Sequence, residues 1–198
     1  FLGLFKNVNY KANNAEFYKT DNTVSEFYGA LGFKSELGLF KFNDGNLNIL
    51  KPKILFKISP DDSRNIHENP TTLNFANLFK LNKVKQIDEI DTGSNISLGF
   101  DYKIHNLDEN KQIIGEKFRL GLGAVISAKE NRDMPSKSTL NEKFSDLVGE
   151  TSYSLNENIK ISNNFLLDQN LSDINKNEIE LGFNYPKTSF NISFLEQA

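Results

Sequence analysis

The sequence predicts an all-β fold in which antiparallel strands follow one another as a meander. Apolar and polar residues alternate with a period of two along most of the 198 residues. Polar segments separate these runs, and one of them, NDGN at 43–46, contains the Asp-Gly turn signal. No run has the apolar spacing of a helix of three or more turns. Consecutive strands joined by turns are therefore expected to pair antiparallel.

The first half of the chain supplies three expected strands. Residues 1–12 and 25–42 alternate irregularly. Residues 46–59 alternate clearly, with Leu50 and Ile54 on one face and Lys51 and Lys57 on the other. Pro52 lies inside this last strand and cannot donate to a sheet ladder. We therefore expect a bulge or a break in pairing there, at a rim position.

The second half supplies six more strands. Residues 95–105 alternate most clearly, with Leu98 and Phe100 on one face and Ser97 and Asp101 on the other. The remaining expected strands are 113–128, 145–156, 157–168, 176–185 and 188–195. A one-residue slip would exchange the two faces, so the alternation also predicts which side chains share a face.

The same alternation occurs in soluble sheets and in membrane barrels. Several strands here keep it for about ten residues, whereas soluble strands usually run five or six. Tyr102, Tyr153 and Tyr185 lie near strand ends, as in the aromatic girdle of an outer-membrane barrel. These features favour a transmembrane β-barrel, with a soluble antiparallel sheet as the alternative.

Composition excludes several classes of function. The net charge of −3 gives no basic footprint for nucleic acid, and the absence of cysteine excludes disulfides and thiolate metal sites within this chain. No apolar run approaches the roughly 18 residues of a membrane helix. Phe1 begins in mid-pattern and the last strand-like run ends the sequence, so we expect an internal piece of a larger barrel.

A long insert at about 60–94 carries no strand signal. Within it, Phe75, Leu78 and Phe79 have helical spacing, which predicts one short helical turn. Structureless loops of this length are usually functional or disordered. These apolar residues and Leu81 favour an ordered loop that folds back onto its own protein, with a floppy surface loop as the alternative.

Polar residues give little sign of catalysis or metal binding. His67 and His105 have no nucleophile or metal-ligand partner at a suitable spacing, so we interpret both as solvated. Asp88, Glu89 and Asp91 offer carboxylate oxygens to a divalent cation or are ordinary loop solvation. No enzyme activity, cofactor or metal is expected.

The segment NLFKLNKVKQIDEIDTGSNISLG resembles the long loop and following strand of the LptD family of outer-membrane lipopolysaccharide assembly proteins. The positions that carry the resemblance are Asn77, Leu78, Phe79, Asn82, Asp88, Gly93 and Gly99. Lys83 and Glu89 depart from it, because the family usually has arginine at the first and often at the second. LNILKPKILF resembles the family's preceding strand, and KFSDLVGETSYSLNENIKISNNFLLDQN resembles a later strand pair.

The resemblance implies a large barrel in a Gram-negative outer membrane that exports lipopolysaccharide to the outer leaflet without catalysis. It implies contact with lipopolysaccharide and outer-membrane lipids, a plug lipoprotein of the LptE type, and a periplasmic bridge of the LptA type that meets parts outside this sequence. The alternatives are another outer-membrane barrel, of the porin or adhesin type, and a barrel phospholipase.

The resemblance also gives the insert a role. Long loops of the family fold inward, because a wide barrel encloses space that its own side chains cannot fill. The expected anchors of such a loop cap are Phe75, Leu78, Phe79, Leu81, Asn82, Asp88 and Gly93. Lys103, Lys117 and Arg119 would face the lumen, where they attract phosphorylated glycolipid or are simply hydrated.

Overall fold

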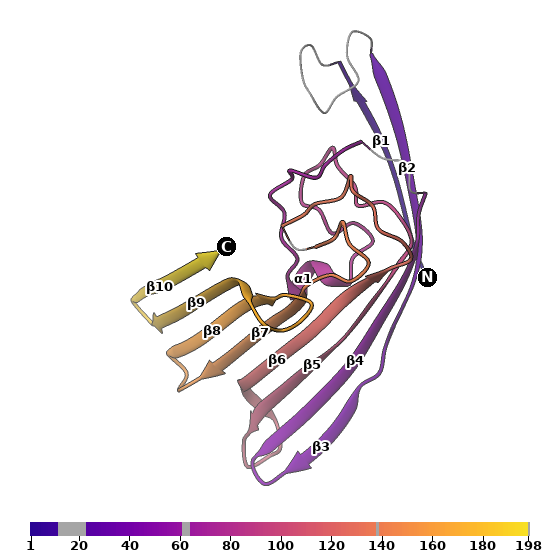
Figure 1. The fold of residues 1–198 in the computed structure, drawn as a ribbon. Coiled ribbons are helices and arrows are strands. Elements are labelled where there is room, and N and C mark those ends of the chain that lie inside the picture. The colour runs from indigo at the N-terminus through magenta and orange to yellow at the C-terminus, as the bar shows by residue number, and fades with distance from the viewer. Residues whose placement is uncertain (12–22, 61–63, 138, 198) are drawn as a thin grey trace.

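The structure, a computed structural model, describes residues 1–11, 23–60, 64–137 and 139–197. Ten strands form one curved antiparallel sheet in the order β1-β2-β4-β5-β6-β7-β8-β9-β10, with β3 paired to β4 (Figure 1). The predicted all-β, antiparallel class is confirmed. Among the described residues β1 and β10 are not paired with each other, so the sheet is an open arc, consistent with part of a barrel.

Most strands are long. They are β1 (Leu2–Tyr10), β2 (Val24–Glu36), β3 (Leu39–Asn43), β4 (Asn46–Ile58), β5 (Asn95–Leu107), β6 (Ile113–Ser127), β7 (Leu147–Ser154), β8 (Ile159–Leu167), β9 (Ile174–Tyr185) and β10 (Thr188–Gln197). Strands β2, β4 and β5 each have 13 residues and β6 has 15. A membrane-spanning strand needs about 9–11, so these strands are long enough to cross a bilayer.

Pro52 explains why the range 25–42 holds two strands instead of the one expected. Glu36 of β2 is opposite Lys53 and Leu39 of β3 is opposite Leu50, so the gap between β2 and β3 lies opposite Pro52. The Pro52 carbonyl accepts a hydrogen bond from Leu37 N–H at 3.2 Å on that side. Proline has no N–H to donate on this side of β4, so pairing is interrupted there. The expected break is present, but at mid-strand and not at a rim.

The two faces of the sheet differ in what covers them. On the outer face apolar side chains such as Phe56, Leu98 and Phe190 are exposed. On the inner face Ser97 is fully buried, as are its neighbours Leu55 and Val125. The alternation predicted that Ser97 lies on the polar face, and that face is the inner one, where the chain's own loops cover Ser97.

Two long connections cover part of the inner face. The insert, residues 59–94, joins β4 to β5, and a second loop, residues 128–146, joins β6 to β7 (Figure 1). The hydrophobic core lies between these loops and the sheet. A soluble sandwich would instead bury the apolar outer face against a second sheet.

Helix content is minimal. The insert contains α1 (Phe75–Leu78), which is the short helical turn that the apolar spacing predicted. Within the described ranges no helix is long and apolar enough to cross a membrane.

The exposed outer face predicts a depth-dependent penalty for charge. Phe100 lies near the middle of β5 on the outer face. In the full-length protein, Phe100→Arg should lower the free energy of unfolding in lipid by about 2–4 kcal/mol if this face contacts the bilayer core. Asn164→Arg, on the inner face of β8 opposite Glu150, should have a much smaller effect. Unfolding titrations in lipid vesicles measure both, and equal penalties would contradict the membrane assignment.

Candidate functional site

The inner face carries a shallow trough where the insert rests. Gly99, Gly121 and Gly123 lie on the inner faces of β5 and β6, and Gly123 is opposite Gly99. A Cβ at Gly121 would lie 2.9 Å from the Phe75 ring, and one at Gly123 would lie 2.5 Å from Leu78 Cδ2. Because real Cβ atoms do not come this close, glycine is what lets the helix approach the sheet backbone.

The trough continues toward β2 and β5 under the rest of the insert. A Cβ at Gly32 would lie 2.5 Å from Leu81 Cδ2, and one at Gly99 would lie 3.1 Å from Phe79 Cζ. All four expected apolar anchors, namely Phe75, Leu78, Phe79 and Leu81, are buried. Their side chains therefore fill a groove formed by glycines of three strands.

Local hydrogen bonds fix the helical turn above the trough. Asn77 N–H donates to Asn74 Oδ1 at 2.9 Å and Asn74 N–H donates to Asn77 Oδ1 at 2.8 Å, which is a reciprocal cap. The Asn77 amide also donates to the Lys83 carbonyl at 3.0 Å. Phe75 and Phe79 meet edge to face with ring centroids 5.7 Å apart. Together these contacts hold the ring pair in one orientation.

The ends of the insert are tied together. Gly93 N–H donates to the Pro60 carbonyl at 3.1 Å, with a φ of 86° that favours glycine. Asn82 bridges the returning segment, because its amide donates to the Glu89 carbonyl at 3.1 Å and accepts from Asp91 N–H at 3.0 Å. The two ends of the insert are therefore held together where it leaves and re-enters the sheet, and we call this pairing of Pro60 with Gly93 the neck.

A buried ion cluster joins the insert to β4. Lys57 Nζ lies 2.9 Å from Asp91 Oδ2, and Lys83 Nζ lies 3.5 Å from the same oxygen. Lys83 Nζ also lies 3.2 Å from Asn95 Oδ1. Both lysine side chains have no exposed surface and Asp91 is 3% exposed. Burial lowers the pKa of Lys83 to about 8, although Asp91 opposes this shift.

The three acidic residues considered as cation ligands, Asp88, Glu89 and Asp91, do not converge on one point. Asp88 pairs with Arg64 at 3.1 Å, Asp91 pairs with the two lysines, and Glu89 accepts from the Asn69 amide. Burial raises the pKa of Glu89. Among the described residues no group of three or more potential metal ligands is present. The anchor Asp88 therefore braces the insert internally through Arg64.

The expected lumen-facing cations differ in their surroundings. Arg119 Nε lies 3.2 Å from Asp101 and its Nη1 lies 2.9 Å from Glu150, while Lys103 lies 3.4 Å from Glu116. These charges lie on the inner face, beside the edge of the insert. Lys117 is exposed at a register shift in β6, where Ile104 pairs with Phe118 and His105 with Glu116. The bulge places Glu116, not Lys117, beside Lys103.

The contribution of the second loop to the site was not predicted from the residue pattern. Met134 and Leu140 of this loop are buried in the same core as the insert. Thr92 N–H lies 3.3 Å from Met134 Sδ, and Ile66 N–H donates to the Asp133 carbonyl at 2.7 Å. The available sequence signal was the presence of Met134 and Leu140 in a mostly polar connection.

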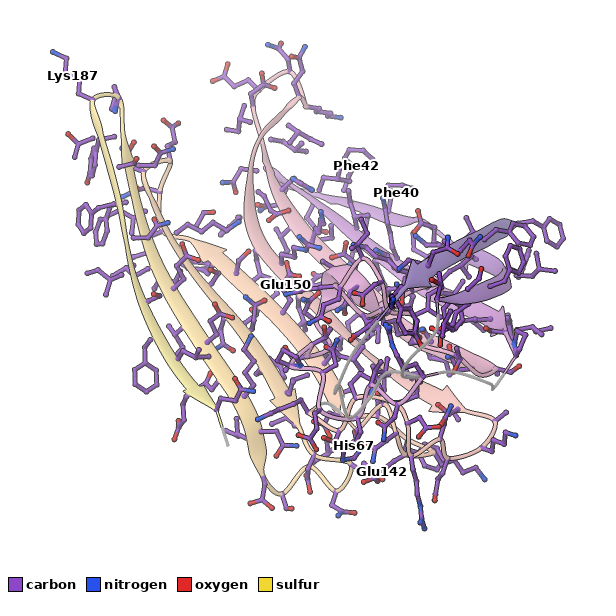
Figure 2. All side chains as sticks on the ribbon, turned by 90° about the horizontal axis from the view of Figure 1, so that it is seen from above. Phe40, Phe42, His67, Glu142, Glu150 and Lys187 are labelled. Carbon is purple, nitrogen blue, oxygen red and sulfur yellow. The ribbon has the colours of Figure 1, made fainter. Side chains whose placement is uncertain are left out.

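The histidines lie apart from each other. His67 lies in the insert (labelled in Figure 2). Its Nδ1 is 3.1 Å from the Arg132 carbonyl of the second loop. His105 lies on the inner face opposite Leu47. A barrel phospholipase would need its histidine on the outer face near a rim, and His105 does not lie there.

Long antiparallel strands with an exposed apolar outer face, and an inner face partly covered by the chain's own loops, are the features of a β-barrel fragment. A family model described as LptD, LPS transport system D, matches residues 7–198, so the chain belongs to the LptD family. No curated protein matches the sequence.

The buried ion cluster predicts that Asp91 is needed to keep the insert docked. Asp91→Asn would leave two buried lysines without an anion, which should cost about 3–5 kcal/mol of docking free energy. Amide hydrogen exchange across 75–84 in the full-length protein should accelerate accordingly.

Asp88→Asn is the matched control. Asp88 is 37% exposed, and Arg64 also donates to the Asp88 carbonyl at 2.7 Å. Its loss should cost about 1 kcal/mol or less. If both variants exchange like the unmodified protein, the ion cluster does not hold the insert.

Proposed function

We propose that this chain forms part of an outer-membrane conduit that delivers lipopolysaccharide to the outer leaflet of a Gram-negative bacterium, with the insert as a plug of the lumen. The LptD family is a transport component of the outer membrane, and its family match covers nearly the whole chain. Conduit transport needs no catalytic group. In this proposal the exposed apolar outer face contacts outer-membrane lipids.

One observation carries the plug assignment, namely the burial of the insert's apolar anchors against the inner face. Leu78 is 0% exposed and Phe75 and Phe79 are buried, all three above glycines. Burying a large apolar side chain contributes on the order of 1.5–3 kcal/mol, so the docked position is strongly favoured over a solvated loop. A docked loop would narrow the lumen while leaving the strand ladders intact.

The family relationship supports further partners. A plug lipoprotein of the LptE type and a periplasmic bridge of the LptA type are proposed to act with the complete protein. The inner faces of β8 and β9 carry polar side chains, including Asn164 and Glu178. They leave a hydrated surface available to a second component within the barrel.

Deleting the helix-bearing part of the insert tests this function. Replacing residues 74–90 by a short Gly-Ser linker removes Lys83 but leaves the Lys57–Asp91 pair matched. Because the ladder between β4 and β5 does not involve these residues, the protein should reach the membrane at normal levels. Cells should then show reduced surface lipopolysaccharide or increased entry of large antibiotics.

Ile87→Ala is the control for this deletion. Ile87 is 88% exposed although it lies inside the deleted range, so both readouts should match the unmodified protein. If the deletion protein also matches in surface lipopolysaccharide and in antibiotic entry at normal abundance, the insert is not a functional plug.

A further inference from the structure

An apolar patch interrupts the polar inner face at the end of the sheet where the short turns lie. Phe40 of β3 is opposite Ile49 of β4, and Phe42 is opposite Leu47. Ile49 is in turn opposite Lys103, whose side chain pairs with Asp101 on the inner face. Phe40, Phe42, Leu47 and Ile49 thus share the inner face, and we name them the inner apolar patch.

The insert leaves the two aromatic rings of this patch uncovered, whereas Leu47 is buried and Ile49 is half-buried. The hydrophobic core between the loops and the sheet contains Leu55, which lies toward the opposite end of β4 from Leu47. Phe40 and Phe42 are 62% and 64% exposed in the described structure (labelled in Figure 2). Their neighbour Lys41 lies on the outer face, so the usual apolar-out alternation is reversed from Phe40 to Phe42, although Leu39 still lies on the outer face.

A positively charged row separates the patch from the plug. Its cations and carboxylates, on the inner faces of β4 to β8, are Lys51, Lys53, Lys103, Arg119 and Lys160 with Asp101, Glu116 and Glu150. Asp101 is within 4 Å of three of these cations, at 3.7, 3.9 and 3.2 Å. The row therefore holds more positive than negative charge directly beside exposed aromatic rings.

We propose that the inner apolar patch and this row form a contact site for the lipid part of lipopolysaccharide. Acyl chains lie on Phe40 and Phe42, and the adjacent phosphate groups lie at Lys51 and Lys103. Apolar surface next to surplus positive charge matches an anionic amphiphile, and neither feature alone would select one. This inference rests on the proposed function and assigns a substrate contact within it.

Crosslinking from the patch tests the assignment. A photoreactive phenylalanine analogue replaces Phe40, Phe42 or, as control, Lys41 in the full-length protein in living cells. Irradiation should give lipopolysaccharide adducts at Phe40 and Phe42 and several-fold fewer at Lys41, which lies on the opposite face of the same strand. Adducts with a polypeptide or with phospholipid in place of lipopolysaccharide, or no adduct, would overturn the assignment.

A second variant tests the apolar contribution. With the analogue at Phe40, Phe42→Ser should lower the adduct yield roughly tenfold, because part of the apolar surface proposed to contact the acyl chains is lost. Lys41→Ser should leave the yield unchanged. An equal yield in both variants would contradict an acyl-chain contact.

Depletion of the protein in the same strains separates this inference from the proposed function. If depletion leaves surface lipopolysaccharide unchanged, the proposed function itself is wrong, and the contact site falls with it. If depletion blocks delivery and yet no lipopolysaccharide adduct forms at Phe40 or Phe42, only the contact site is wrong.

Discussion

The close approach of the insert to the sheet backbone is the interaction on which the other features depend. A wide sheet encloses more space than its own side chains can fill, so its inner face needs a cover from elsewhere in the chain. Gly99, Gly121 and Gly123 give that face a floor without side chains, and Phe75 and Leu78 rest on it. Larger residues at these glycine positions would move the insert away from the sheet and expose its packed apolar side chains to water.

Charge then determines where the cover rests. Apolar packing alone tolerates small displacements of the insert. Asp91, in contrast, can contact both Lys57 and Lys83 only when the insert lies in one position. A buried ion cluster is weak grounds for net stability, because desolvation offsets much of the attraction. We propose that the ion cluster fixes the position of the insert on the sheet. A shifted insert would leave a buried charge without its partner. The neck between Pro60 and Gly93 fixes the same register from the other side.

Much of this architecture could be predicted from residue patterns, because strand alternation is local. The faces of β5 and the helical turn at Phe75–Leu78 follow from spacing alone. The division of 25–42 into β2 and β3 did not, because it depends on Pro52 in the neighbouring strand. Contacts between distant segments were also missed, including the second loop with Met134.

The glycine trough shows why the candidate site was only partly predictable. The glycines of β5 and β6 appeared simply as members of the polar face, and Lys57 looked like the other lysines of β4. Their roles depend on what the insert places above them, which spacing does not encode. Phe75, Leu78, Phe79 and Leu81 were predicted as anchors and lie buried on the inner face, while their role in closing a conduit stays a prediction.

An engineered disulfide between the insert and the trough tests the docked plug most directly. A Cβ at Gly121 would lie 2.9 Å from Phe75 Cγ, so cysteines at both positions would have Cβ atoms within about 4.5 Å, the range of a disulfide. The sequence printed here contains no cysteine. In the full-length protein in membranes, the pair Phe75→Cys with Gly121→Cys should crosslink readily, and the pair Ile87→Cys with Gly121→Cys should not. Failure of the first pair in folded protein, or equal crosslinking of both pairs, would contradict a plug seated on the glycine trough.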